Sequence, residues 1–378
     1  MSIAKHAALA TAFLLLACGQ PSEQQEERGA GGSQPEPMDI SLTLVAVDSI
    51  GVELGDSNYV LGQPAGVSYS PSGDIWVLDM QQKSLGVYSA EGEYVRSIGR
   101  EGSGPGEFLM PISFDFYPDG SFLVADAMGR RISFFDSTGE FSRNIEGFFP
   151  SAPFLVEAVD SSSFVGLKAD FEQSDEGPLM GYTLALWEEE AEPVLKYFSE
   201  LNPFDPSDIM GSMGEEIPLF ATTPDGRVFC SPLSTERYVV WGYRPDGTEL
   251  LEIEREFRRI RKTEEEIAEE KELVTQQMIS GGAPESMAES YEPSPYRPAT
   301  AGLGIDGEER LWVRLGTFIN PTYHVYDLQG EHLFNAEVDY PGDAEGWQIY
   351  IGEGGFLAFD QNPEDYPRVY VLRAVEAD

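Results

Sequence analysis

The chain has 378 residues, of which 66 are Asp or Glu and 24 are Lys or Arg, so its net charge at pH 7 is −42. A charge of this sign and size repels nucleic-acid phosphate and anionic lipid headgroups, which excludes both as electrostatic partners. The chain is 41% apolar and 12% aromatic, which suffices for a large folded core under a very acidic surface.

The N-terminus has the features of an export signal. Lys5 precedes an apolar run, Ala7 to Ala17, of about eleven residues, which is too short to span a bilayer. The run ends in LLAC, whose Cys18 resembles the lipidated cysteine of bacterial lipoproteins. The resemblance implies that residues 1–17 are a signal peptide that is removed. An ordinary signal peptide that contains a cysteine is the alternative.

The residues after Cys18 are polar up to Pro37. In bacterial lipoproteins an Asp after the lipidated cysteine signals retention in the inner membrane, and Gly19 stands there instead. The resemblance therefore implies the outer membrane of a two-membrane cell envelope. We expect residues 18–37 to be a flexible tether that joins the lipid anchor to a monomeric folded part, residues 38–378.

From Pro64 onward the sequence repeats about every forty-five residues. The first two copies, Pro64–Gly99 and Pro111–Gly147, match position by position, with PSGDIWVLD in one and PDGSFLVAD in the other. Each copy contains four short apolar strands separated by turns, and four weaker copies follow. Six such units predict an all-β fold, a six-bladed β-propeller that fills the folded part.

The sixth copy stops after RVYVLRAVEAD and lacks a fourth strand. An alternating apolar segment, Ile40–Val47, precedes the first copy and can supply that strand, which would remove an open sheet edge. We therefore predict a ring that is closed by an N-terminal strand.

A glycine-rich loop, GREGSGPGEFLMP, connects the first two copies. A phosphate-binding loop requires Lys and Ser or Thr after its last glycine and a helix behind it, whereas Glu107, Phe108 and a strand pattern follow here. The glycines therefore serve the crossing from one blade to the next.

The second copy and the loop before it resemble NHL-type repeats, which share the elements G-x-G-P-G, D-G, V-x-D and R-I-x-x-F-D. With the N-terminal cysteine, the tether and a helical insertion, the chain resembles the bacterial six-bladed β-propeller lipoproteins, with NHL/TolB-like architecture. The resemblance implies a disc with two loop-bearing faces and a central channel. It implies no particular activity, because propellers host many functions.

One insertion, residues 258–296, precedes the fifth copy. Thr263 and Glu266 form a capping box before apolar residues at helical spacing, which predicts a helix from about Glu264 to Ile279. This helix is either a decoration packed on one propeller face or a lid or docking element over the channel mouth. A shorter insertion, Glu200–Glu216, can line the same region.

Residue sets typical of catalysis are scarce. Once the leader is removed, only His324 and His332 remain, which excludes a three-histidine zinc site, and no G-x-S-x-G motif occurs. We expect both histidines on strand surfaces. Cys230 lies in an apolar strand pattern and is expected to be a buried, unreactive thiol.

Asp79 and Asp126 occupy the same place in the first two copies, at the ends of VLD and VAD. In NHL-like repeats this Asp satisfies backbone groups at a strand end, and we expect that role here. The alternative is that these carboxylates hold Ca²⁺ near the channel. Gluconolactonase-type propellers use such a site to hydrolyse lactones, but the glutamate of their first inner strand has no counterpart in PAGVSYS.

Two neighbouring arginines, Arg130 and Arg131, stand out in so acidic a chain. Arg131 matches the arginine of the NHL pattern, which implies a structural ion pair. Arg130 is the candidate for contacting an anionic ligand.

A complete scaffold without a recognisable nucleophile, catalytic base or metal set predicts a non-catalytic module without a cofactor, which binds a protein, a peptide or a saccharide. The alternative is a divalent-metal-dependent hydrolase or lyase, lactonase-like, that uses carboxylates at the central channel. Four or more carboxylate or amide oxygens converging at the channel mouth would favour the enzyme.

Overall fold

The structure is a computed structural model. It describes residues 38–205, 212, 216–280, 285–342, 344, 346–360, 363 and 365–377. The predicted signal peptide, Cys18 and the tether lie outside the described residues, as does most of the shorter insertion. Among the helices that are described, none is long and apolar enough to cross a membrane.

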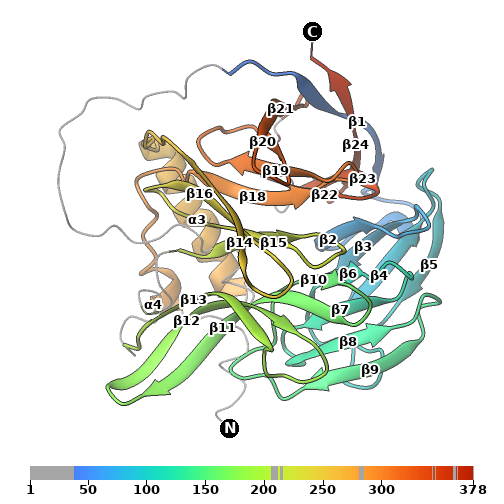
Figure 1. Cartoon of the computed structure of the whole chain (residues 1–378). Coiled ribbons are helices and arrows are strands. Elements are labelled where there is room, and N and C mark those ends of the chain that lie inside the picture. Colours follow the sequence, from blue (N-terminus) through green and yellow to red (C-terminus); the bar gives the residue numbers. More distant parts are fainter. Residues whose placement is uncertain are drawn as a thin grey trace.

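The chain forms a ring of six four-stranded antiparallel blades, which confirms the predicted six-bladed β-propeller (Figure 1). The first blade holds β2 (Pro64–Tyr69), β3 (Ile75–Asp79), β4 (Ser84–Tyr88) and β5 (Tyr94–Ile98), and the second holds β6 (Pro111–Phe116), β7 (Phe122–Asp126), β8 (Arg131–Phe135) and β9 (Phe141–Glu146). The third holds β10 (Leu155–Val159), β11 (Ser163–Ser174), β12 (Gly177–Trp187) and β13 (Leu195–Pro203).

The other three blades follow in chain order. The fourth holds β14 (Pro218–Thr222), β15 (Val228–Pro232), β16 (Tyr238–Tyr243) and β17 (Glu249–Arg255). The fifth holds β18 (Thr300–Ile305), β19 (Arg310–Leu315), β20 (Thr322–Asp327) and β21 (His332–Asp339). The sixth holds β22 (Trp347–Gly352), β23 (Gly355–Asp360), β24 (Val369–Glu376) and, from the N-terminus, β1 (Leu42–Ile50). A short 3₁₀-helix, η2 (Ser57–Tyr59), lies before the first blade.

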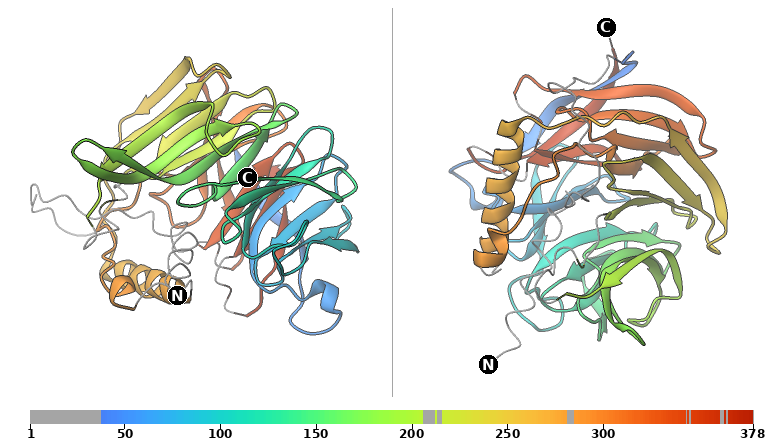
Figure 2. Two further views of the ribbon diagram at one scale, coloured as in Figure 1. Left: turned by 90° about the horizontal axis from the view of Figure 1, so that it is seen from below. Right: turned by 90° about the vertical axis from the view of Figure 1, so that its left-hand side faces the viewer.

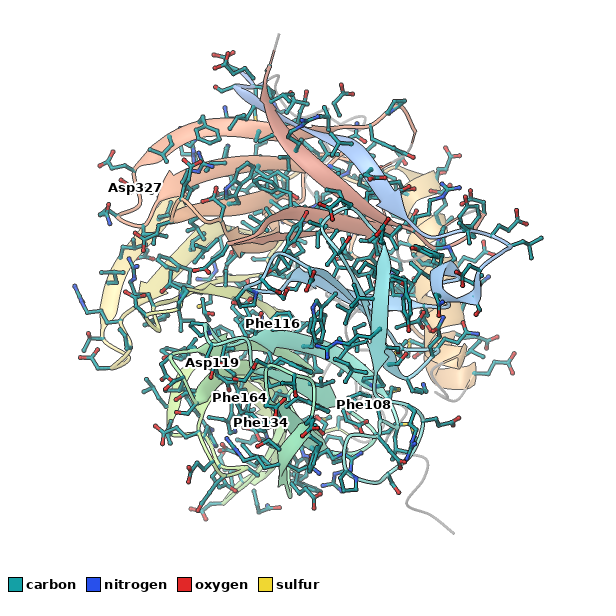
Figure 3. The ribbon with its side chains drawn as sticks, turned by 90° about the vertical axis from the view of Figure 1, so that its right-hand side faces the viewer. Phe108, Phe116, Asp119, Phe134, Phe164 and Asp327 are labelled. Carbon is teal, nitrogen blue, oxygen red and sulfur yellow. The ribbon has the colours of Figure 1, made fainter. Side chains whose placement is uncertain are left out.

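Burial explains the residue pattern within a blade. Every residue of β3, β7 and β8 is buried, because a middle strand is covered by the neighbouring blades on both faces. The outer strand β5 alternates between half-buried and exposed residues before its buried end, because its edge faces solvent. Phe134 of β8 and Phe164 of β11 meet between the second and third blades, with ring centroids 6.3 Å apart (Figure 3).

The N-terminal strand closes the ring, as predicted. β1 pairs with β24 in antiparallel orientation and with β21 in parallel orientation, so the fifth and sixth blades join into one eight-stranded sheet. The first strand of every blade contacts the first strand of the next blade, and β22 contacts β2. The ring is therefore closed both at its inner strands and at its outer edge.

Because strand direction alternates, the connections fall on two faces. The loop face carries the connections from each blade to the next and those between second and third strands. The turn face carries the hairpins after the first and third strands. Figure 3 shows the turn residues Asp119 and Asp327 on one side and Phe108, in the glycine-rich loop, on the other.

The large insertion lies on the loop face and contains the helices α3 (Glu264–Ser280) and α4 (Glu285–Ala288) (Figure 2). The predicted capping box is present: the Thr263 N–H donates to Glu266 Oε2 at 2.7 Å, and the Glu266 N–H donates to Thr263 Oγ1 at 3.2 Å. Val274 and Met278 are buried in the same apolar cluster as the second and third blades. The helix is therefore packed onto the propeller rather than held away from it.

The closing strand supplies a direct test of ring stability. Leu44 of β1 is 0% exposed and packs between the last two blades, whereas Val47 in the same strand is 44% exposed. We expect Leu44→Ala to lower the free energy of unfolding by about 2–5 kcal/mol, since it leaves a cavity at the closure. Val47→Ala, the matched control, should change it by less than about 0.5 kcal/mol. Urea unfolding measures both, and equal effects would show that β1 does not hold the ring.

Candidate functional site

The two aspartates predicted from matching repeat positions lie at matching strand ends. Asp79, buried at the end of β3, accepts hydrogen bonds from backbone N–H groups of two segments, one just before β2 and one just after β3. The donors are Gly62 at 2.6 Å, Gln63 at 3.1 Å, Gln81 at 3.0 Å and Gln82 at 2.9 Å. This carboxylate therefore fastens the loop before β2 to the turn after β3.

Asp126 does the same work in the second blade. It is 0% exposed and accepts from the N–H groups of Met110 at 2.8 Å and Gly129 at 3.1 Å. Arg131 lies 3.2 Å from its Oδ2 and forms the ion pair that the repeat pattern implied. Asp79 and Asp126 each serve the loop of their own blade, and the structure does not bring them together in one site.

Arg131 also holds the glycine-rich loop. Its guanidinium donates to the Ser103 carbonyl at 3.0 Å and to the Glu107 carbonyl at 2.6 Å. The Glu107 carboxylate lies within the loop, accepting from the Gly104 N–H at 2.9 Å and pairing with Arg100 at 2.7 Å. The Gly104 hydrogen bond and the Arg100 guanidinium lower the pKa of Glu107. The Glu107 carboxylate therefore already accepts from the Gly104 N–H and the Arg100 guanidinium, which are donors that a bound phosphate would need.

Arg130 has a different environment from its neighbour. It is exposed on the loop face, where its Nε and Nη2 donate to the Phe148 carbonyl at 3.2 Å and 2.5 Å. Its guanidinium carbon lies 5.7 Å from the centroid of the Phe149 ring. Its φ of 51° recurs at Lys83, the equivalent residue of the first blade, where φ is 58°, so this backbone conformation belongs to the turn.

A hollow of about 420 Å³ lies beside Arg130 on the loop face. We call it the loop-face hollow. Its walls include Leu109, Met128, Arg130, Glu146 and Phe148, which come from three segments: the glycine-rich loop, the turn between β7 and β8, and the exit from β9. Arg131 also lines the hollow, which therefore combines the apolar side chains of Leu109 and Met128 with two cationic side chains and one anionic side chain.

An aromatic row extends from this hollow toward the third blade. Phe149 is 62% exposed, and its ring meets Phe171 at 6.2 Å, which in turn meets Phe204 at 5.8 Å. Phe171 lies in β11 and Phe204 directly after β13, so the row crosses the loop-face end of the third blade.

Exposed large apolar side chains also gather on this face. Those in loop-face connections or in the insertion are Leu54, Met128, Phe149, Leu273, Ile279 and Ile319. The other exposed ones in the described part of the chain lie on strands or at a turn-face hairpin: Val47, Val95, Val194, Leu333 and Val375.

Two channel carboxyls, Asp115 and Glu157, escaped the sequence reasoning. Asp115, on the inner strand β6, accepts from the Ala158 N–H of the next blade at 2.7 Å. Glu157, on the inner strand β10, accepts from the Thr222 N–H at 2.6 Å and from Thr222 Oγ1 at 2.9 Å. Each carboxyl thus bridges its own blade to the following one. A charged residue inside an apolar inner strand, as in SFDFYP and FLVEAV, was the available signal.

The surroundings of these carboxyls favour their neutral forms. Burial raises the pKa of Asp115 to about 7. Burial, together with the nearby Asp115 carboxyl, raises the pKa of Glu157 to about 8. Across the described residues, no three His, Cys, Asp or Glu side chains are grouped so that they could hold a metal ion. The pair can hold and release a proton near neutral pH.

The histidines and the cysteine have structural surroundings. The prediction of surface histidines is wrong for His324, which is half-buried between the fourth and fifth blades with Nδ1 3.2 Å from Tyr238 Oη. Burial, with the Arg255 charge and His332, lowers its pKa to about 3. His332 is exposed, as predicted. Cys230 is fully buried, and burial raises the pKa of its thiol to about 12.

The channel pair predicts a particular pH dependence of stability. The native state retains protons on Asp115 and Glu157 that the unfolded chain releases at lower pH. Their contribution to the free energy of unfolding therefore falls as pH rises from about 4 to about 8. Glu157→Gln keeps an oxygen acceptor for Thr222 and removes the charge, so it should gain stability relative to the wild type as pH rises. Thermal unfolding across this range measures it.

The control is Glu93→Gln, which changes an exposed carboxylate on the outer edge of the first blade. It should leave the slope of stability against pH unaltered. A Glu157→Gln variant with the same slope as the wild type would show that this carboxyl is ionised throughout.

The family model that matches part of this chain agrees with the observed architecture. A family model described as a 6-bladed β-propeller (DUF5128) matches residues 52–160. Structural comparison finds a member of the DUF4221 family from Bacteroides vulgatus, at 12% identity and TM-score 0.48, covering 89% of this chain and 99% of that one. It also finds a putative exported protein from Bacteroides fragilis (14%, TM-score 0.46, 90% and 97%) and virginiamycin B lyase from Staphylococcus aureus (10%, 0.43, 88% and 88%). No curated protein matches the chain.

Proposed function

We propose that this chain is an exported, lipid-anchored six-bladed propeller that acts as a non-catalytic binding module for a protein, a peptide or a saccharide. The observation that carries this proposal is the concentration of exposed apolar side chains, with Arg130 and the loop-face hollow, on one face of a very acidic molecule. Binding sites are enriched in aromatic residues, Met and Arg, and their centres are depleted of other charged residues.

The proposed anchor is Cys18, with residues 18–37 as the tether and the outer membrane as the site of attachment. The repeats would then make the chain an NHL-like member of the bacterial propeller lipoproteins. The point at which the described chain enters the fold supports an orientation in which the turn face lies toward the anchor. Asp39 enters the fold at the turn face, where its carbonyl accepts from Asn335 Nδ2 at 2.9 Å, beside the start of β21. A chain that is tethered at the turn face presents its loop face to partners.

A second candidate function is hydrolysis by the channel carboxyls. The observation that favours it is the Asp115–Glu157 pair, whose pKa values near neutrality suit general acid–base chemistry. Ca²⁺ would serve as the metal in the lactonase-like form of this candidate. Because both carboxyls already accept hydrogen bonds from the adjoining blade, we place this candidate second.

Chemical cross-linking in native membranes, followed by capture through a C-terminal tag and mass spectrometry, tests the binding function. We expect a reproducible partner whose cross-linking falls at least about tenfold in the double variant Leu273→Asp/Ile279→Asp, since two exposed apolar contacts of α3 are lost. Val95→Asp, on the outer edge of the first blade, is the control and should retain the partner.

A partner that both variants retain equally would place the interface elsewhere. If cross-linking yields no partner, the second candidate is tested by screening lactones and glycans. Turnover that disappears in Glu157→Gln would then establish the enzyme and overturn the binding module.

A further inference from the structure

We infer that the loop-face hollow is a subsite for a peptide segment of a protein partner, in which an apolar side chain enters the hollow and an adjacent carboxylate pairs with Arg130. This inference rests on the proposed binding function and names the kind of partner that the face accepts.

The anionic half of the ligand follows from Arg130. The guanidinium is exposed, and two of its nitrogens are fixed by the Phe148 carbonyl, which orients the group without neutralising it. Among the described residues, Arg130 makes no ion pair with a carboxylate, whereas Arg131 beside it pairs with Asp126. An oriented guanidinium without a counter-charge is suited to a carboxylate, with which it forms charge-assisted hydrogen bonds.

The apolar half of the ligand follows from the walls of the hollow. Leu109 and Met128 supply apolar surface, whereas the Phe148 side chain is buried in the core, and the volume of about 420 Å³ falls in the range of small ligand sites. Met128 is 45% exposed, so this surface is open to solvent in the free protein. A single large apolar side chain would bury it.

The charges around the hollow favour a peptide over an acidic polysaccharide. Glu146, whose charge is opposite to that of Arg130, also lines the hollow. The whole chain has a net charge of −42. A polymer with many carboxylates would be repelled, whereas a peptide can place one carboxylate on Arg130 and a backbone N–H or a basic side chain near Glu146. The aromatic row Phe149–Phe171–Phe204 extends the contact for flanking residues.

The test uses a display library of random linear peptides and an array of acidic glycans, both probed with the detergent-solubilised full-length protein. We expect enriched peptides that carry an apolar residue beside Asp, Glu or the C-terminal carboxylate. Their affinity should fall about tenfold or more in Arg130→Met and in Phe149→Ala.

Two matched controls separate binding from folding. Lys83→Met changes the equivalent turn residue of the first blade, and Val95→Ala shortens an exposed apolar side chain elsewhere. Both should keep the affinity within about twofold and the melting temperature unchanged. Met128→Trp should fill the hollow and abolish binding while Arg130 stays in place, which keeps the inference testable if Arg130→Met perturbs the fold.

The inference is overturned if enriched peptides lack this pairing, if their binding is indifferent to Arg130→Met and Met128→Trp, or if only acidic glycans bind through Arg130. Failure here differs from failure of the proposed function. A cross-linked partner that persists in Arg130→Met but disappears in Leu273→Asp/Ile279→Asp would keep the loop face as a binding surface and move the contact from the hollow to α3.

Discussion

The pairing of β1 with β24 is the constraint on which the rest of this structure depends. Without β1 the sixth blade has three strands, and the edges of β24 and β21 are both open to pairing with other chains. With β1 in place, residues 42–50 and 369–376 lie side by side, and the first and last parts of the propeller must fold together. Because β1 runs parallel to β21, the described chain enters the fold near Asp39 at the turn face.

A closed ring creates a second demand at its centre. The inner strand of each blade has one sheet edge that faces the neighbouring blade, and its buried N–H groups need acceptors. Asp115 and Glu157 supply them across two successive blade boundaries, and Ser113 Oγ does so for the Val156 N–H at 3.1 Å. Asp79 and Asp126 likewise accept hydrogen bonds from backbone N–H groups at the loop-face ends of the first two blades. These four carboxyl groups, which could have indicated a catalytic site, therefore accept hydrogen bonds from backbone N–H groups instead.

The features that could be predicted from the sequence are those that repeat within a blade. The strand order, the closing strand and the paired positions of Asp79 and Asp126 all follow from aligning one copy with the next. Asp115, Glu157 and the half-buried His324 could not be predicted in this way, because their partners belong to the adjacent blade and no repeat pattern encodes contacts between blades. The loop-face hollow was missed for a related reason: its walls come from three separate connections, and no single repeat copy contains the contacts among them.

Arg130 and Arg131 show how local conformation can leave one of two neighbouring side chains exposed and bury the other. Arg131 begins β8, where its side chain reaches Asp126 and the glycine-rich loop. Arg130 precedes it in the left-handed turn conformation, which sends the chain out of regular strand geometry before β8 begins. Because the turn recurs at Lys83, the scaffold sets the backbone there and leaves the side chain free to vary. The exposed residue of this turn can therefore change while Arg131, one position later, continues to hold Asp126 and the glycine-rich loop of the second blade.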